Sequence, residues 1–222
     1  FESIRLIKPE CQKRKIPLIG FSGGPFTNAA YLIEGKSSSS LPKTKELLHQ
    51  NPEKFHTLLN QLKQATIHYI DAQIHAGVDV IQLFDTWLNH LNFFQAKLYL
   101  ETIITPIIKH INNKVPTLFF CKNSTALAPL IAKTGANGIS IDQYSHLPAI
   151  QDNISKNIIL QGNLDPLVLF SNPKTIKNTV TDLISPIQNK QNYIFNLGHG
   201  ILPKTPLKNV EALLKAVRAI TI

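Results

Sequence analysis

The sequence has 222 residues, of which 43% are hydrophobic and 17% are charged, and its formal net charge is +9. A chain of this length and hydrophobicity can bury a full core in one or two domains, and its charge content is too low for a disordered chain. The positive charge is compatible with a nucleic acid, an anionic lipid or an anionic small molecule as the partner. Because the lysines are scattered and no nucleic-acid-binding motif is present, we expect a solvated basic surface and no nucleic-acid partner.

Neither a membrane segment nor a metal site is predicted. No run approaches the roughly 18 apolar residues of a membrane span and no signal-peptide pattern opens the chain, so we expect a cytoplasmic protein with no membrane partner. The two cysteines, Cys11 and Cys121, are too few for a disulfide framework, and the eight histidines lack metal-binding spacing. The chain begins at Phe1 and has no methionine, which favours either a piece of a longer product or a sequence whose methionines were not recorded.

The first structural pattern is the stretch Pro17–Gly35, which reads PLIGFSGGPFTNAAYLIEG. It predicts a buried strand over Pro17–Phe21, a tight turn of small residues over Ser22–Pro25, and a helix that carries Tyr31. Such a turn is either an ordinary strand–loop–helix connection or a place where another group lies close to the backbone. Pro25 lacks the amide donor that a phosphate cradle would use, so nucleotide binding is not predicted.

Five further apolar runs follow in chain order. They are near-continuous rather than alternating, a pattern typical of parallel strands buried on both faces. These runs are Val78–Phe84, Val115–Phe120, Asn137–Ile141, Asn157–Gln161 and Tyr193–Leu197.

Helix signals lie between the runs. Three helices are predicted to begin with a capping side chain followed by proline, at Asn51-Pro52, Asn172-Pro173 and Thr205-Pro206. Gly77 is predicted to end the first of them. The serine run Ser37–Ser40 predicts a mobile loop.

Six strand–helix units predict an α/β fold, either a doubly wound open sheet or a (β/α)8 TIM barrel. Small or polar residues follow every predicted strand, and in a barrel these ends form one shared mouth, whereas an open sheet needs such residues only beside its switch point. They are Gly20–Gly24, Asp85-Thr86, Lys122-Asn123, Asp142, Gly162-Asn163 and Gly198-His199. We therefore predict a single barrel domain over residues 1–222. It is incomplete, with about six of the eight units, and the missing two are expected before Phe1.

His199 differs from the other histidines because it stands between two glycines at a predicted strand end. The glycines allow a sharp turn that would aim the imidazole into the mouth. The alternative is a histidine that is hydrogen-bonded within its own turn.

Four motifs in this order closely resemble the uroporphyrinogen decarboxylase family, and together they cover nearly the whole chain. They are GFSGGPFTNAAYLIEG (Gly20–Gly35), VIQLFDTW (Val80–Trp87), QGNLDP (Gln161–Pro166) and NLGHGILPKTP (Asn196–Pro206). The resemblance implies a (β/α)8 barrel, a homodimer with facing clefts, and removal of CO₂ from the four acetate side chains of uroporphyrinogen to give coproporphyrinogen, with no cofactor.

The resemblance also implies site residues. By motif position, Tyr31, Thr86 and His199 match substrate-contacting residues of the family, and Phe21 matches an aromatic residue that lines the cleft. From the residues alone, Tyr31 is interpreted as a tyrosine packed in the core, and Thr86 could equally be a helix cap beside Asp85.

The sequence departs from the family pattern in several places. The arginine-bearing R-Q-A-G-R segment and the catalytic aspartate that faces the pyrrole N–H groups do not appear, and both are expected upstream of Phe1. Asn28 replaces an aliphatic residue, which is expected to perturb packing behind Tyr31. Two alternatives stay open: an inactive fragment or non-catalytic remnant, and a zinc- and corrinoid-dependent methyltransferase of the same fold, whose H-x-C ligand pair is replaced here by Phe119-Phe120-Cys121.

Overall fold

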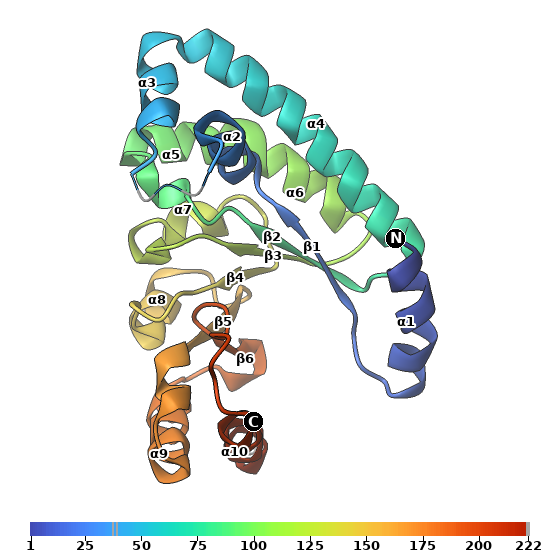
Figure 1. Cartoon of the computed structure of the whole chain (residues 1–222), viewed down its shortest axis with the longest axis vertical. Coiled ribbons are helices and arrows are strands. Elements are labelled where there is room, and N and C mark those ends of the chain that lie inside the picture. Colours follow the sequence, from blue (N-terminus) through green and yellow to red (C-terminus); the bar gives the residue numbers. More distant parts are fainter. Residues whose placement is uncertain (37, 39, 221–222) are drawn as a thin grey trace. The chain divides into compact units, whose positions relative to one another are not determined.

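The computed structural model describes residues 1–36, 38 and 40–220, and it groups helices and parallel strands into two compact units (Figure 1). Unit 1 comprises Phe1–Lys122 and Leu130–Asn137, and unit 2 comprises Asn123–Pro129 and Gly138–Ile222. Of the predicted loop over Ser37–Ser40, the residues Ser37 and Ser39 lie outside the described part of the chain.

Unit 1 contains three parallel strands in chain order. They are β1 (Ile19–Gly23), β2 (Val80–Phe84) and β3 (Thr117–Phe120). Parallel neighbours need crossover connections, and helices supply them. The helices of this unit are α1 (Glu2–Lys13), α2 (Pro25–Glu34), α3 (Pro42–Gln50), α4 (Pro52–Ala76), α5 (Phe93–Tyr99) and α6 (Thr105–Asn112), with a short 3-10 turn at Leu88–His90 and a π-helical segment at Leu100–Ile104.

The strands of unit 1 differ in how they are buried. All four residues of β3 are buried, as predicted for a strand covered on both faces. Strand β1 alternates instead: Gly20 and Ser22 are buried, whereas Phe21 is 63% exposed. The prediction of burial on both faces is therefore wrong for β1, because only its Gly20 and Ser22 face packs against neighbouring side chains such as Gln73 of α4.

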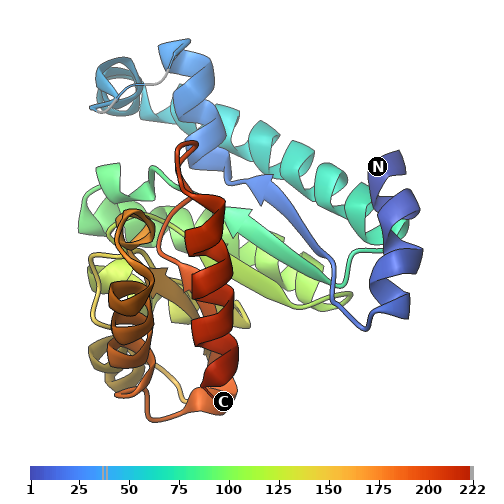
Figure 2. The same ribbon diagram turned by 60° about the horizontal axis from the view of Figure 1, so that its bottom comes forward.

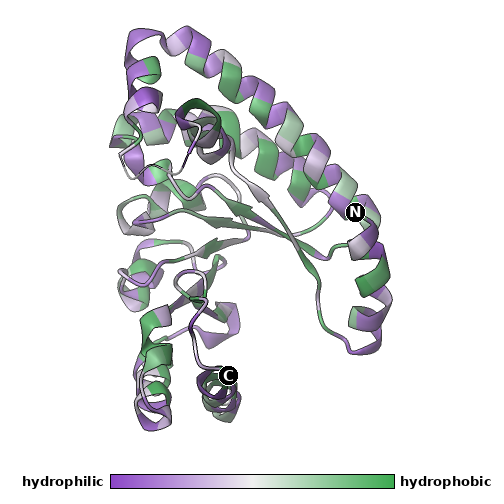
Figure 3. Cartoon of the chain, in the orientation of Figure 1, coloured by the Kyte–Doolittle hydropathy of each residue, from purple (hydrophilic) through white to green (hydrophobic). Residues whose placement is uncertain are grey.

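The core of unit 1 lies between the strands and the helices. Phe26 of α2 contacts Phe55 of α4 and Tyr99 of α5 edge to face, with ring centroids 6.1 and 6.0 Å apart. Figure 3 shows hydrophobic and hydrophilic residues alternating around α4, as expected for a helix with one buried face. No helix within the described residues is long and apolar enough to cross a membrane.

Two of the three predicted helix starts are confirmed. Asn51 Oδ1 accepts a hydrogen bond of 3.1 Å from Lys54 N at the start of α4, which ends at Gly77 with φ +110°. Asn172 caps α9 (Pro173–Ile184) in the same way. The third prediction is wrong about the capping residue. Pro206, and not Thr205, occupies the N-cap position of α10 (Leu207–Ala219), and no side chain caps that helix.

Unit 2 also contains three parallel strands in chain order, β4 (Gly138–Ser140), β5 (Ile159–Leu164) and β6 (Tyr193–Leu197). Its helices include α8 (Leu147–Asn153), α9 and α10, with a 3-10 turn at Pro166–Phe170, and α7 (Ala128–Ala132) precedes β4 in the chain. Helices α9 and α10 lie side by side in both views (Figures 1 and 2). Asn209 of α10 donates to the carbonyl oxygens of Leu169 and Ser171, both at 2.8 Å, which ties α10 to the segment before α9.

The fold class is therefore α/β. Each of the six predicted runs overlaps an observed strand, and all observed pairings between consecutive strands within a unit are parallel. The six strand–helix units within the described residues are two fewer than a closed (β/α)8 barrel requires, which makes this an incomplete TIM barrel.

Candidate active site

The turn after β1 packs closely against the residues at the end of β2. Gly24 N donates a hydrogen bond of 2.8 Å to the carbonyl oxygen of Phe84, and α2 begins directly afterwards with Pro25 at its first position. A Cβ atom on Gly24 would lie 2.3 Å from Cγ of Asp85. The group that lies against this small-residue turn is therefore the carboxylate of Asp85, and only glycine leaves room for it.

Asp85 is fully buried and hydrogen-bonded on both of its oxygens. Oδ1 accepts hydrogen bonds from Thr27 N at 2.8 Å and from Thr27 Oγ1 at 2.7 Å, and Oδ2 accepts one from the hydroxyl of Tyr99. The Tyr99 oxygen also accepts from Phe26 N at 2.9 Å. Burial raises the pKa of Asp85 to about 6, although the donors on Tyr99 and Thr27 oppose the shift.

This buried network fixes the backbone on either side of Thr86. Trp87 N donates to Thr27 Oγ1 at 3.1 Å, so Thr27 holds the residues before and after Thr86 at once. Sequence reasoning placed Asp85 at a strand end but missed this network. The available signal was an aspartate directly after one predicted buried strand, together with a threonine in the first turn of the helix that follows β1.

Thr86 is half-buried, and its carbonyl oxygen accepts a hydrogen bond of 3.2 Å from Lys122 N. Within the described residues its hydroxyl makes no hydrogen bond. The following 3-10 turn has Trp87 at its N-cap position, so Thr86 does not cap a helix. The hydroxyl is thus held on a fixed backbone where it can donate to a bound carboxylate.

Phe21 and Tyr31 present exposed rings in the same unit. Gln73 holds the backbone of Phe21, accepting from its N at 3.0 Å and donating to its O at 2.8 Å, while the ring is in edge contact with Phe84 at 6.2 Å. Tyr31 is 46% exposed and therefore not a core tyrosine, and its ring meets Trp87 edge to face at 6.5 Å. Phe21 therefore contacts Phe84, and Tyr31 contacts Trp87. Both partners lie within two residues of Thr86 in the sequence.

Asn28 lies half-buried on α2 and folds back onto the turn. Its Nδ2 donates to the carbonyl oxygen of Gly23 at 3.2 Å, and a Cβ atom on Gly23 would lie 2.4 Å from Asn28 Oδ1. The amide thus has a local hydrogen-bonding partner. Its effect on the packing behind Tyr31 stays a prediction.

His199 lies in unit 2, exposed, in the turn after β6. Its Nδ1 accepts a hydrogen bond of 2.6 Å from Gly200 N, which places the proton of the neutral imidazole on Nε2. A Cβ atom on Gly198 would lie 2.3 Å from Gln143 N, so this turn also depends on glycine. The hydrogen bond of Nδ1 agrees with the alternative of a histidine bonded within its own turn, and a role of Nε2 in substrate binding stays a prediction.

Unit 2 holds a second buried aspartate at a strand end. Asp142 Oδ1 accepts from Ser145 Oγ at 3.1 Å, and Oδ2 accepts from Asn123 N. Asn163 Nδ2 donates to the carbonyl oxygens of Asp142 and Ser145 at 2.6 and 2.7 Å. Like Asp85, these polar strand-end side chains hold loops in place rather than standing open for chemistry.

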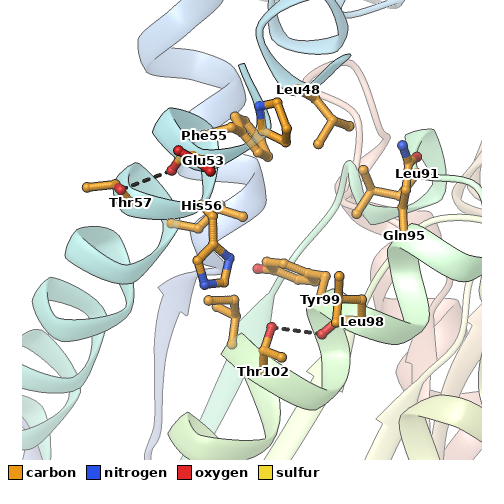
Figure 4. Close-up of a pocket in the computed structure, with 13 residues that line it drawn as sticks. Leu48, Glu53, Phe55, His56, Thr57, Leu91, Gln95, Leu98, Tyr99 and Thr102 are labelled. Atoms are coloured by element: carbon orange, nitrogen blue, oxygen red, sulfur yellow. Dashed lines mark hydrogen bonds between the residues drawn. The ribbon is translucent and has the colours of Figure 1, made fainter. Parts of the chain in front are cut away.

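A cavity of about 500 Å³ lies among α3, α4 and α5 and is mostly apolar (Figure 4). Leu48, Phe55 and Leu98 are among its lining residues, and none of the four predicted site residues lines it. The ring of Tyr99 also borders it, so the cavity reaches the back of the Asp85 network.

Among the residues that the structure describes, no group of three or more histidine, cysteine, aspartate or glutamate side chains could hold a metal ion. Cys121, the thiol considered for a methyltransferase-type zinc site, is fully buried.

Comparison with known proteins identifies the family of this chain. A family model described as uroporphyrinogen decarboxylase matches residues 1–220. A uroporphyrinogen decarboxylase of Coxiella burnetii is 40% identical over 227 residues, covering 100% of this chain and 63% of the relative, and one of Alkalilimnicola ehrlichii is 36% identical over 225 residues, covering 99% and 61%. The chain thus spans less than two thirds of the length of these curated relatives.

Among solved structures, a methyltransferase from Methanosarcina mazei superposes with a TM-score of 0.83 at 22% sequence identity, covering 98% of this chain and 63% of that one. At this identity the likeness concerns the fold alone. The family match over residues 1–220 carries the assignment. This chain belongs to the uroporphyrinogen decarboxylase family.

Proposed function

We propose that the protein is a carboxy-lyase that removes CO₂ from the four acetate side chains of uroporphyrinogen to give coproporphyrinogen, without a cofactor. The observation that carries the proposal is the family match over residues 1–220. The site supports it because the exposed rings of Phe21 and Tyr31 contact Phe84 and Trp87, two residues that lie close to Thr86 in the sequence.

The reaction requires a proton on a pyrrole carbon. Protonation makes the ring an electron sink, the bond between the acetate methylene and the carboxylate breaks, and its electron pair moves into the ring as CO₂ leaves. A proton then adds to the methylene carbon and another leaves the ring, so each cycle consumes one proton and converts an acetate into a methyl group. The protein must orient the tetrapyrrole and bind its carboxylates while charge moves into the ring.

We assign roles on this basis. The Thr86 hydroxyl, the Tyr31 hydroxyl and the Nε2–H of His199 donate hydrogen bonds to substrate carboxylates, and the ring of Phe21 packs against a pyrrole. The buried Asp85 network acts through the backbone, since it holds Thr27 and Trp87 on either side of Thr86. Asp85 is therefore a positioning residue and not the carboxylate that faces the pyrrole N–H groups.

We also propose that this aspartate and the carboxylate-binding arginines come from residues outside these 222, so that the 222-residue chain by itself is inactive. The family resemblance further supports a cytoplasmic homodimer, which size-exclusion chromatography with light scattering would test. The likeness to a methyltransferase concerns the fold alone, and we do not propose methyl transfer.

The experiment compares the 222-residue chain with the complete product of its gene. Each is incubated anaerobically with uroporphyrinogen, the products are oxidised, and porphyrins with four to eight carboxylates are separated chromatographically. We expect the complete product to form the tetracarboxylate through the intermediates and the short chain to form none. A complete product that leaves the octacarboxylate intact would contradict the proposed reaction, and turnover by the short chain would contradict its inactivity.

A further inference from the structure

We propose that Lys122 is a further substrate-positioning residue, whose ammonium group binds a carboxylate that the substrate retains. The inference rests on the proposed function for the identity of the ligand, a flat tetrapyrrole with carboxylates at its rim. It rests on the geometry of unit 1 for the location, because Lys122 follows β3 and is joined by its backbone to Thr86.

Lys122 lies against the residues already assigned to substrate binding. Its N donates to the carbonyl oxygen of Thr86 at 3.2 Å, and its Nζ lies 4.4 Å from the ring centroid of Trp87. The same indole meets the ring of Tyr31 at 6.5 Å. The ammonium group thus lies over the ring that Tyr31 contacts, and the backbone of Lys122 is hydrogen-bonded to that of Thr86.

The ammonium group has an aromatic partner instead of an acidic one. Lys8, Lys97 and Lys114 form ion pairs with carboxylates, whereas no ion pair within the described residues includes Lys122. Lys122 is half-buried, and its ammonium group lies over an indole ring. A cation in this position keeps its charge, and its N–H groups can still donate hydrogen bonds. A carboxylate ligand would supply the charge-assisted hydrogen bonds that the ring cannot.

The surroundings of Trp87 are positively charged from more than one element. The ring of His90 lies 5.5 Å from that of Trp87, and the pKa of His90 is lowered, first by burial and then by the charges of Lys45 on α3 and Lys122. Both lysines therefore act on the same small region. Such a region favours an anionic group over a neutral one.

The reaction chemistry selects which carboxylate Lys122 binds. A strong ionic partner on the departing carboxylate would stabilise the ground state more than the transition state, in which its charge has moved into the ring. A compact ammonium group is suited to hold a carboxylate that keeps its charge throughout. Lys122 should therefore affect substrate binding and KM, with little effect on kcat.

The test measures binding without turnover, so that it can succeed or fail independently of the proposed reaction. Uroporphyrin, the oxidised octacarboxylate, is titrated into the 222-residue chain, and binding is followed through the emission of Trp87, the single tryptophan of the sequence. We expect Lys122→Met to weaken binding roughly tenfold, Lys122→Arg to restore most of it, and added salt to reduce the difference. The control is Lys109→Met on α6, an exposed lysine with no ion pair within the described residues, which should bind as the parent does.

A second measurement needs no variant. Bound uroporphyrin should slow the acetylation of Lys122 by a lysine-directed reagent at least several-fold, relative to Lys109 in the same sample, as measured by mass spectrometry. In the complete gene product, Lys122→Met should raise KM for uroporphyrinogen with kcat unchanged. Unaltered uroporphyrin affinity in Lys122→Met, or unaltered acetylation of Lys122, would overturn the inference. Binding that depends on Lys122, together with a complete gene product that leaves uroporphyrinogen intact, would instead contradict the proposed reaction.

Discussion

Thr27 Oγ1 in the first turn of α2 donates a hydrogen bond of 2.7 Å to Oδ1 of Asp85, which follows β2 and is fully buried. The two residues are 58 positions apart in the sequence. Their contact fixes the start of the helix that carries Tyr31 relative to the strand end that carries Thr86. The candidate site of unit 1 therefore depends on a buried polar network behind it, and this dependence can be tested.

Tyr99→Phe should destabilise the protein without changing its shape. The substitution leaves Asp85 Oδ2 without its donor and Phe26 N without its acceptor, both in the core, so we expect the free energy of unfolding to fall by about 1–3 kcal/mol. Urea unfolding measures this. The matched control is Tyr31→Phe, whose exposed hydroxyl has no hydrogen bond within the described residues and whose loss should change stability by less than about 0.5 kcal/mol. Equal losses in the two variants would contradict the network.

The pH dependence of stability should carry the signature of Asp85. Burial raises its pKa from 3.8 to about 6 in the folded state, so between these values the folded state binds more protons than the unfolded state. The free energy of unfolding should then fall as the pH rises from about 4 to 6, by up to about 3 kcal/mol from this group, and the contribution is fully present only below pH 3.8.

Urea unfolding at several pH values, in parallel for the parent and Asp85→Asn, isolates this contribution. The difference between the two curves should slope between pH 4 and 6, because the amide does not titrate. Asp182→Asn on α9, an exposed aspartate, serves as the control and should follow the parent. Parallel curves for the parent and Asp85→Asn would show that Asp85 does not titrate in this range.

Gly24→Ala should be strongly destabilising. The added methyl group would lie 2.3 Å from Asp85 Cγ, and the buried carboxylate is held by hydrogen bonds from Thr27 and Tyr99. We expect a loss of roughly 2–4 kcal/mol, measured by thermal or urea unfolding. Gly200→Ala is the matched control, because a Cβ atom there meets nothing within 4 Å. A tolerated Gly24→Ala would mean that Asp85 does not fill the space behind the turn.

Thr86→Val should lower activity while preserving the fold. Valine keeps the shape of threonine but lacks the hydroxyl that we assign to a substrate carboxylate, so kcat/KM of the complete gene product should fall roughly tenfold to a hundredfold. Thr86→Ser retains a hydroxyl and should recover much of the loss. If valine and serine variants are equally active, the hydroxyl has no role in binding or catalysis.

His199→Asn separates the two nitrogens of the imidazole. Asparagine Oδ1 can replace Nδ1 as the acceptor for Gly200 N, so this hydrogen bond should be kept, whereas the donor at Nε2 is lost. We expect a roughly tenfold or greater loss of kcat/KM in the complete gene product. Steady-state kinetics with uroporphyrinogen measure this loss. A variant with unchanged kcat/KM would show that His199 has no role in substrate binding.

The sequence by itself determined the elements whose signals are local. Asn51 and Gly77 bound α4 as predicted, because a cap and a left-handed glycine act within one helical turn. The apolar runs located every strand to within a few residues, and the four motifs were sufficient to indicate the family. These features depend on neighbours along the chain, and so they can be read from the chain alone.

Only the tertiary structure decided what the strand-end residues do. It showed that Asp85 is buried behind the site and bonded to Thr27 and Tyr99, that β1 is covered on one face, and that Lys122 lies over Trp87. Each of these contacts joins residues that the chain separates by a dozen to several dozen positions. Neither propensity nor spacing specifies such partners, because burial and charge become defined only when the strands and helices have packed.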